Sequence, residues 1–568
     1  MYVNGESDKK TGAMAKSSIN DLSRQQSVGQ GITAENSDHL LRRLTNRHIQ
    51  LIAIGGSIGT GLFVSIGNAL NQSGPAGLLL AFILYCTMVG LVNNCMAEMI
   101  TYFPVAGGFI RLAGHFVDEA FGFMAGWNFF LYQAFLIPFE ISALAIVVKF
   151  WGDEVPIWSM CLMCIVLYAI LNLLVVDAYG EAEFWLSGGK VVLVFSFFLF
   201  TFITMVGGNP KHDAYGFRYW KNPGAFAEYR SSGNLGRWEG FLAALWNVSF
   251  TVVGPEYISL IAAEAKHPRT YLKAAYKTIY FRFLLFFLGS ALCVGIVLPH
   301  NDPTLVSIVR GGSSGAGTAA ASPYVIAMSN LGVTIFPHVV NFLLVTSIFS
   351  AGNTYVYCAS RSLYGLALEG RAPKFLTKCT RNGIPIYCFL IAICFAGLSF
   401  LQVKESTASF LNTLINLVTA GAFINYVVMS ITYICFYRAM KFRGYDRKSL
   451  SYYAWFQPYC AWIGLAFFTC IVGTYGYATF NPWDIEGFFG CYTMAMLSII
   501  FFVFWKVVKR TNFVDPHHVD LIWERPVVDA YENTATEAPS TFWREMRDSL
   551  RIQKYITRRN GEDMLRGS

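Results

Sequence analysis

The sequence predicts an all-α membrane protein that crosses the bilayer about twelve times. Only 14% of the 568 residues are charged and 54% are hydrophobic, whereas soluble domains carry about 25% charged residues. Apolar runs long enough to cross about 30 Å of hydrocarbon recur along the chain. Because lipid offers no hydrogen-bond partner to the backbone, these runs are expected to be helical. They lie at 49–70, 76–101, 121–149, 157–176, 185–206, 239–262, 278–298, 333–360, 384–403, 408–436, 455–480 and 487–508.

Basic residues gather in the connections on one side of these spans. The positive-inside rule therefore predicts that both ends of the chain lie in the cytosol. The connection 207–238 also carries basic residues, on the opposite side, but long loops constrain orientation less. The net charge of +8 is thus explained by the orientation of the chain in the membrane and gives no reason to expect a nucleic-acid partner. The clusters on the cytosolic side comprise Arg42, Arg43 and Arg47; Lys266, Arg269, Lys273 and Lys277; Arg371, Lys374, Lys378 and Arg381; Arg438, Lys441, Arg443 and Arg447; and Lys506, Lys509 and Arg510.

The chain is expected to divide into a cytosolic amino-terminal tail, 1–46, a transmembrane domain, 47–510, and a cytosolic carboxyl-terminal tail, 511–568. Both tails hold too few apolar residues to form cores, so they are expected to be disordered or only locally ordered. The first tail lacks the apolar core of a cleavable signal peptide, so the first span should direct insertion. Trp523, Pro526 and Trp543 indicate that part of the second tail docks against the membrane domain.

No metal, cofactor or catalytic site is expected. The thirteen cysteines include a Cys161-x-x-Cys164 pair inside the fourth span, without histidine or acidic neighbours, and are interpreted as small core residues. No nucleophile and base pair, metal motif or nucleotide motif stands out, which argues against an enzyme.

Two of the predicted helices are interrupted. The first span contains Gly55-Gly56-Ser57-Ile58-Gly59-Thr60-Gly61, and a helix broken at mid-membrane depth exposes amide donors and carbonyl acceptors that can hold a ligand. The alternative is that these glycines only permit close helix packing. The sixth span carries Val253-Gly254-Pro255-Glu256, where proline removes a helix donor. Because the breaks lie five spans apart, the two halves are expected to be inverted repeats, with the last two spans added.

At the level of motifs, the chain resembles the fungal amino-acid permeases of the amino acid–polyamine–organocation superfamily. The resemblance rests on GGSIGTGLF at 55–63, SGPAG at 73–77, PVAGGF at 104–109, YGEAEFW at 179–185, AEAKHPR at 263–269 and NTYVYCASRSLYGLALEGRAPKF at 353–375. It implies a LeuT-like five-plus-five inverted repeat with two further helices and proton-coupled import of amino acids across the plasma membrane. Departures at His267 and at Asn425-Tyr426 leave the substrate open, because span ten faces the substrate side chain in this fold.

The substrate is expected to bind at the two breaks. Its carboxylate should meet the amides around Ser57, Gly59, Thr60 and Gly61, because the start of a half-helix attracts an anion and glycine allows close approach. Its ammonium should meet carbonyls freed near Ile54 and around Thr251 to Gly254. Side chains expected to line the remainder of the site are Phe250, Tyr257 and Asn353.

Three charged residues inside the spans are candidates for proton coupling. Glu140 and Glu256 each lie in an apolar span, where an unpaired charge costs at least about 2.5 kcal/mol. Burial favours the neutral form of a carboxyl group, so either could take up and release a proton; alternatively, each only fixes helix packing. The ammonium of Lys190 could stand where sodium-coupled relatives bind sodium, or it could reach water along its flexible stem.

Two other functions stay open at this point. The carboxylates also suit a carrier of amino-acid-like cations such as carnitine, choline or a polyamine, and the tails suit a nutrient-sensing receptor derived from a permease fold. The expected partners are the amino acid, a proton and membrane lipid, together with ubiquitin ligase adaptors on the tails, where Lys9, Lys10 and Lys16 offer acceptors.

Overall fold

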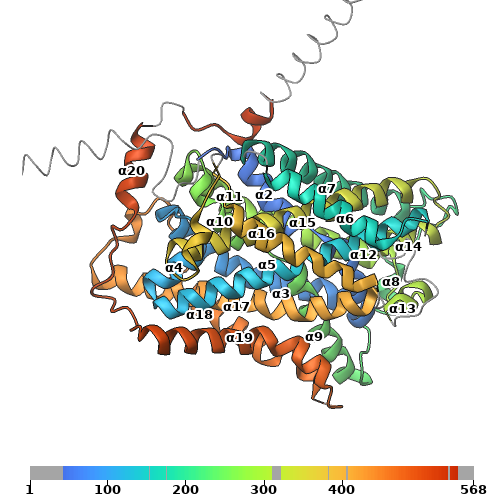
Figure 1. Cartoon of the computed structure of the whole chain (residues 1–568). Coiled ribbons are helices and arrows are strands. Elements are labelled where there is room, and N and C mark those ends of the chain that lie inside the picture. Colours follow the sequence, from blue (N-terminus) through green and yellow to red (C-terminus); the bar gives the residue numbers. More distant parts are fainter. Residues whose placement is uncertain are drawn as a thin grey trace, which may run out of the picture.

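The computed structural model describes residues 42–152, 154–173, 176–309, 322–380, 383–403, 407–480, 482–534 and 538–547. In this part of the chain the regular structure is helical, apart from three isolated β-bridges. The long helices run roughly along one direction, from left to right in Figure 1. The acceptor lysines expected in the amino-terminal tail lie outside the described residues.

The first half of the chain forms the first five predicted spans. The first break separates α2 from η1, and α3 contains a sharp kink at Gly74, whose φ of 73° and ψ of 172° interrupt the helix just before Pro75. The part of α3 before the kink completes span one, and the part after it is span two. A side chain at Gly74 would lie 2.7 Å from the backbone nitrogen of Ala227, so the kink requires glycine. The elements are α2 (Asn46–Ser57), η1 (Gly61–Ser65), α3 (Ile66–Tyr102), α4 (Gly108–Phe116), α5 (Glu119–Val148), η2 (Lys149–Trp151), α6 (Ile157–Leu173) and α7 (Val176–Met205).

The second half repeats this arrangement and adds two helices. Its first spanning helix is divided into α9 and α10 by the second break. The elements are α8 (Arg218–Lys221), α9 (Gly233–Thr251), α10 (Pro255–Leu260), η3 (Ala262–Glu264), α11 (Pro268–Arg282), η4 (Phe283–Leu288), α12 (Gly289–Val297), α13 (Pro303–Val309), α14 (Pro323–Asn330), α15 (Phe336–Leu368), η5 (Lys374–Thr377), α16 (Ile386–Ala396), η6 (Gly397–Val403) and α17 (Thr407–Phe442), followed by η7 (Arg447–Ser449), α18 (Tyr459–Thr474), η8 (Tyr477–Thr479), α19 (Ile485–Lys509) and α20 (Arg525–Thr534).

The predicted spans coincide with these helices. Within the described residues, eight helices or joined helical runs are long and apolar enough to cross a membrane, and two shorter apolar ones lie at 157–173 and 386–402. The remaining predicted crossings are the broken ones: the first, which α2 begins, and the sixth, which α9 and α10 share. The all-α polytopic fold expected from the sequence is therefore confirmed.

Equivalent helices of the two halves pack against each other in the centre. The most extensive contacts join α5 to α15, the third span of each repeat, and α3 to α9, which joins the first half to the second. The short helices between spans also correspond: α4 lies at one end of the bundle, whereas α13 and α14 lie at the other (Figure 1). This is the arrangement expected for inverted repeats. A small residue permits close packing at Gly352 on α15, where a side chain would lie 2.1 Å from the hydroxyl of Tyr168.

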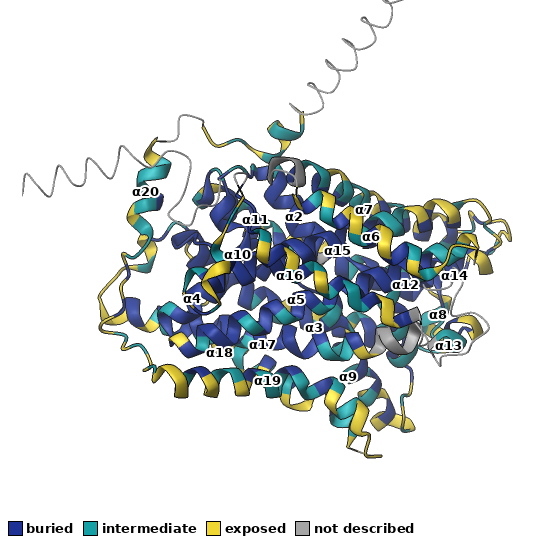
Figure 2. Ribbon diagram, viewed as in Figure 1, coloured by how far each residue is buried: buried dark blue, intermediate teal, exposed yellow. Residues whose placement is uncertain are grey.

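The core lies around the breaks, and the added helices lie at the edge. Burial is highest along α2, α5, α10 and α15, whereas α19 presents a row of exposed side chains (Figure 2). Ile499 and Val507 on α19 are 66% and 69% exposed. Apolar exposure on this scale is what a lipid-facing helix requires.

The described part of the carboxyl-terminal tail covers one end of the bundle. We call this end the tail face; it is formed by the start of α2, by α4 and by the start of α11. Glu524 pairs with Arg111 of α4 at 2.9 Å, and Asp529 on α20 pairs with Arg269 at the start of α11. The ring of Trp523 stacks on His115 at 4.1 Å, as the sequence predicted for part of this tail, whereas Trp543 is 77% exposed.

Candidate functional site

The two helix breaks lie against each other in the interior. Ile58 follows α2 in an extended conformation, with φ of −111° and ψ of 100°, and Val252 follows α9 in a similar one, with φ of −98° and ψ of 104°. A side chain at Gly61 would lie 3.0 Å from Cα of Thr251 and 3.3 Å from the ring of Phe250. The backbone at the start of η1 therefore packs closely against the end of α9, so the two discontinuous helices predicted from the sequence lie side by side.

Glu140 lies at the first break. Its Oε2 accepts a hydrogen bond from the hydroxyl of Thr60, and its Oε1 lies 3.5 Å from the Thr60 backbone nitrogen, a long contact. A side chain at Gly59 would lie 2.8 Å from Oε1. Glu140 comes from α5 and is 1% exposed. Its carboxylate thus occupies the position at the start of a half-helix that favours an anion.

Glu256 takes the corresponding position at the second break. The Gly254 backbone N–H donates to Oε2 of Glu256 at 3.2 Å, and the Tyr426 hydroxyl donates to Oε1 at 3.2 Å. Tyr426 lies on α17, which is the span in which the sequence departs from the resembling family. Each half-helix that follows a break therefore begins at a buried carboxylate of the protein itself.

Lys190 on α7 points into the protein. Its ammonium donates to the backbone carbonyl of Gly55 at 2.6 Å, and the residue is fully buried, so it does not reach water. The carbonyl freed at the end of α2 is thus that of Gly55. The carbonyl of Ile54, which we expected to be free, instead accepts the N–H of Ile58 at 2.9 Å. Ser57 is the last residue of α2, and its side chain is outside what the structure describes.

Glu183 is a buried carboxylate that the sequence reasoning missed. Ser350 on α15 donates to its Oε1 at 2.5 Å, and Ser187 on α7 donates to the same atom at 3.0 Å. Asn353, expected to contact substrate, lies beside this group: its Nδ2 is 3.5 Å from Oε2 of Glu183, and its Oδ1 accepts from Asn172 at 2.7 Å. A signal existed in the sequence, because positions 183, 187 and 190 share one helix face.

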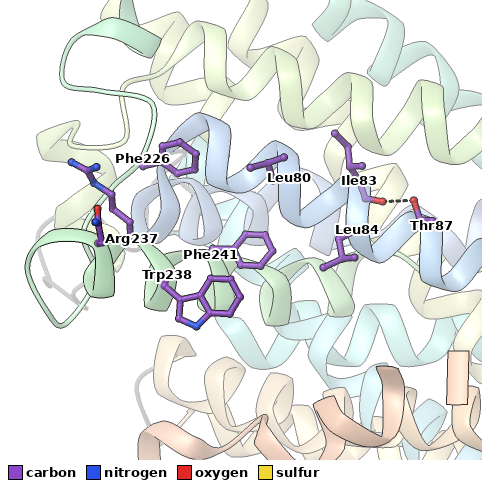
Figure 3. A pocket seen from close by; sticks show the side chains of 9 residues that line it. Leu80, Ile83, Leu84, Thr87, Phe226, Arg237, Trp238 and Phe241 are labelled. Carbon is purple, nitrogen blue, oxygen red and sulfur yellow. Dashed lines mark hydrogen bonds between the residues drawn. The ribbon is translucent and has the colours of Figure 1, made fainter. Parts of the chain in front are cut away.

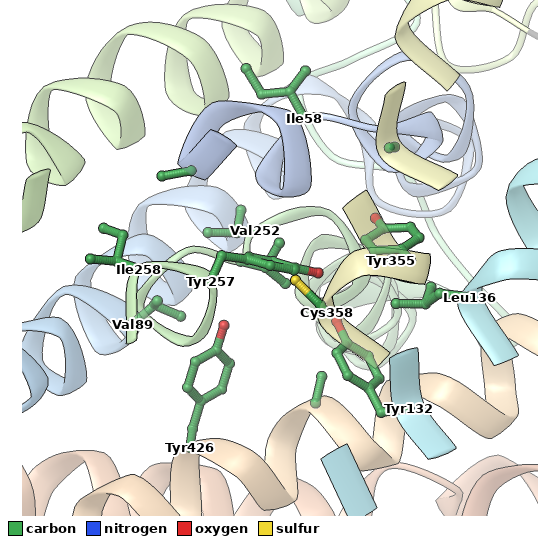
Figure 4. Packing of buried hydrophobic residues seen from close by; sticks show 14 of the residues in the cluster. Ile58, Val89, Tyr132, Leu136, Val252, Tyr257, Ile258, Tyr355, Cys358 and Tyr426 are labelled. Atoms are coloured by element: carbon green, nitrogen blue, oxygen red, sulfur yellow. The ribbon is translucent and has the colours of Figure 1, made fainter. Parts of the chain in front are cut away.

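Aromatic rings fill the space between the breaks. Tyr257 and Tyr355 have ring centroids 6.3 Å apart, and both point toward the centre in Figure 4, with Tyr132 and Tyr426 nearby. A side chain at Gly56 would lie 2.9 Å from the Tyr257 ring. The ring of Phe250 packs against the ring of Phe139, with centroids 4.9 Å apart. Of the residues predicted around the second break, Phe250 and Thr251 thus lie against Gly61 of the first break, and Tyr257 lies against Gly56.

Other intramembrane acids form ion pairs nearer the tail face. Glu264 pairs with Arg361 at 2.7 Å. Glu98 pairs with Arg447 at 2.8 Å, a residue 349 positions away along the chain. These pairs leave Glu140, Glu183 and Glu256 as the acids that surround the breaks.

A groove of about 610 Å³ lies elsewhere, on the outside of the bundle. Figure 3 shows that side chains of α3, of α9 and of the connection before α9 line it, and most of them are apolar. The lining residues are Leu80, Ile83, Leu84, Thr87, Phe226, Asn234, Arg237, Trp238 and Phe241. None of the residues predicted to bind substrate lines this groove. Its apolar wall suits a lipid-facing surface.

The site is built for binding and not for covalent chemistry. Broken backbones, carboxylates and one ammonium meet in a place without lipid contact, where polar groups have to be satisfied by protein or ligand. Among the described residues, no three His, Cys, Asp or Glu side chains are grouped so that they could hold a metal ion. Inverted repeats around two discontinuous helices define a secondary transporter.

Comparison of this chain with known protein families and proteins identifies the family of this transporter. The amino acid permease family model matches residues 48–518, and the chain belongs to that family. It is 44% identical to the general amino acid permease AGP2 of Saccharomyces cerevisiae, over 86% of this chain and 83% of that protein. It is 34% identical to the proline-specific permease of Emericella nidulans, over 89% of this chain and 92% of that protein.

A solved structure supports the fold alone. The manganese transporter of Eremococcus coleocola superposes with a TM-score of 0.51 at 14% identity, covering 86% of this chain and 95% of that protein. The protein is therefore an integral membrane permease with a LeuT-like fold, and not an enzyme.

Proposed function

We propose that this permease is a proton-coupled symporter that imports amino acids across the plasma membrane, with both ends of the chain in the cytosol. The observation that carries the proposal is the contact between Glu140 and Thr60. A substrate carboxylate can take this place only when Glu140 is neutral or moves away, because two buried like charges repel strongly. Binding of an amino acid and binding of a proton would thereby favour each other.

The remaining groups give this proposal its details. The amides around Ser57, Gly59, Thr60 and Gly61 would receive the substrate carboxylate, and carbonyls between Thr251 and Gly254 would receive its ammonium. The names of the relatives support an amino acid as substrate, since one is a general and one a proline-specific permease. The basic residues of the tail face, such as Arg111 and Arg269, support a cytosolic location for that face.

The experiment is uptake of each common amino acid into cells that lack their own permeases. We expect accumulation that rises as the external pH is lowered and that stops when a protonophore is added. Accumulation that follows a sodium gradient and ignores the protonophore would exclude proton coupling. Uptake of none of the amino acids would exclude the substrate class.

One observation favours a second candidate function, transport of an amino-acid-like cation such as carnitine, choline or a polyamine. Two buried carboxylates, Glu140 and Glu256, stand at the breaks, and negative charge there suits a quaternary or protonated amine. The same cells distinguish the candidates. Choline uptake that common amino acids do not inhibit would favour the cation carrier, whereas inhibition by amino acids alone would favour the symporter.

A further inference from the structure

Glu183 connects three helices around the end of α2. It is fully buried on α7, and its Oε1 accepts hydrogen bonds from Ser350 on α15 and from Ser187 on its own helix. A side chain at Gly55 would lie only 2.1 Å from that same oxygen. The carboxylate is therefore in direct contact with the backbone of α2, within its last turn before the break.

The ammonium of Lys190 reaches the same residue of α2. It donates to the Gly55 carbonyl at 2.6 Å, and it interacts electrostatically with Glu183. A buried charge is unfavourable unless an opposite charge or hydrogen bonds stabilise it. Together the two charges of α7 hold the end of α2, while Ser350 connects the same carboxylate to α15.

We propose that Glu183 is a positioning residue in the transport cycle: its carboxylate, with the ammonium of Lys190, holds the last turn of α2 between α7 and α15, and its protonation releases that turn. The inference rests on the proposed proton coupling and names the residue through which the proton would act on the backbone. The proton binds from one side of the membrane and leaves to the other, so the carboxyl group is restored after each cycle.

The hydrogen bonds explain why a proton would loosen this contact. A charged carboxylate only accepts, and its Oε1 takes the hydroxyls of both Ser350 and Ser187. An oxygen of a neutral carboxyl group accepts hydrogen bonds more weakly than an oxygen of a carboxylate, so protonation weakens the bonds from both hydroxyls. Protonation also removes the attraction between Glu183 and Lys190.

Glu183 lies on the side of the first break opposite Glu140, beside Asn353. It touches α2 before the break, at Gly55, whereas Glu140 contacts Gly59 and Thr60 after it. The titratable groups that face Glu183 are Lys190 on α7, Tyr168 on α6 and Cys358 on α15, and Lys190 in turn interacts with Glu140 on α5. A change in the charge of Glu183 would therefore act on the last turn of α2 and leave the contact between Thr60 and Glu140 in place.

The test compares Glu183→Gln with Glu181→Gln in the full chain, reconstituted into vesicles with a ¹⁴C-labelled mixture of the common amino acids. Glu181 lies on the same helix but is 43% exposed and pairs with Arg47, so it controls for loss of a carboxylate from α7. Two rates are measured: accumulation driven by an inward proton gradient, and exchange of internal for external substrate at equal pH.

We expect Glu183→Gln to lower gradient-driven accumulation by at least about tenfold and to keep exchange within about twofold of the parent. Glu181→Gln should keep both rates. Accumulation by Glu183→Gln equal to that of the parent overturns the inference, and so does equal loss of both rates, which would indicate a purely structural role. A parent that ignores the proton gradient but exchanges amino acids refutes the proposed coupling itself.

Ser350→Ala provides a second test that leaves the carboxylate in place. Losing one hydrogen bond to a charged carboxylate favours its protonated form. The pH at which accumulation falls to half should therefore rise by about one unit. An unchanged pH profile in Ser350→Ala, with uptake retained, contradicts the inference.

Discussion

Thr60 donates its hydroxyl to the carboxylate of Glu140 and directs its backbone N–H at the same group. The two residues lie on different helices, 80 positions apart. The backbone part of the contact requires the break in the first span, because only an interrupted helix leaves the Thr60 amide free. An amide at the start of a half-helix attracts an anion. In this structure the anion is a side chain of the protein, which an entering substrate carboxylate would have to replace.

The first prediction tests this contact with Glu140→Gln. Glutamine keeps the volume of the side chain but carries no charge and has only one oxygen to accept the donors of Thr60. We expect normal surface abundance and an initial uptake rate at least about tenfold lower, the effect of losing a charge-assisted hydrogen bond. Glu140→Leu should lose abundance as well, because Thr60 would be left without a buried partner. If Glu140→Gln transports at the parental rate, Glu140 is structural.

The second prediction concerns Gly59, whose Cα faces the same carboxylate. A side chain there would lie 2.8 Å from Oε1 of Glu140 and 3.1 Å from the side chain of Ala351, so Gly59→Val should abolish uptake while leaving much of the protein at the surface. Gly61→Val should do the same, because it would meet the backbone of Thr251 at 3.0 Å. Gly473→Val on α18 is the matched control, since a Cβ there meets nothing within 4 Å. Parental affinity in both Gly59→Val and Gly61→Val would remove the substrate from this break.

The third prediction concerns the second break, through Tyr426→Phe. The substitution removes only the hydroxyl that donates to Glu256 at 3.2 Å, and leaves the aromatic packing against Phe468 at 4.8 Å. Hydrogen bonds to charged groups contribute about 1.5–3 kcal/mol, so we expect a change of about tenfold or more in the ratio of uptake rate to half-saturation concentration. A competition assay with the common amino acids measures any change of preference. Kinetics within twofold of the parent would place Glu256 and Tyr426 outside the transport site.

Local patterns allowed the fold and the breaks to be predicted, because glycine and proline act on the backbone of their own helix. The free carbonyl was placed one residue too early, at Ile54 instead of Gly55, because the end of a helix depends on contacts such as that from Lys190. Glu183 was missed because the predicted span began at 185, although its helix begins at 176. The pairing of Glu98 with Arg447 joins distant parts of the chain and leaves no local pattern.

The last prediction concerns the carboxyl-terminal tail, through Glu545. Its Oε2 accepts the backbone N–H of Arg47 at 2.7 Å, and its Oε1 accepts that of Asn46 at 3.3 Å, so a residue from the far end of the sequence caps the first turn of α2. Thr45, which precedes α2, makes no capping hydrogen bond with its own side chain. Replacing a capping carboxylate costs about 1 kcal/mol of local stability.

In Glu545→Ala we therefore expect backbone amides in the first turn of α2 to exchange hydrogen for deuterium about fivefold faster. Glu154→Ala, in the exposed loop before α6, is the control and should leave this exchange unchanged. Equal exchange in the parent and in Glu545→Ala would show that the tail does not cap α2 in the protein in solution.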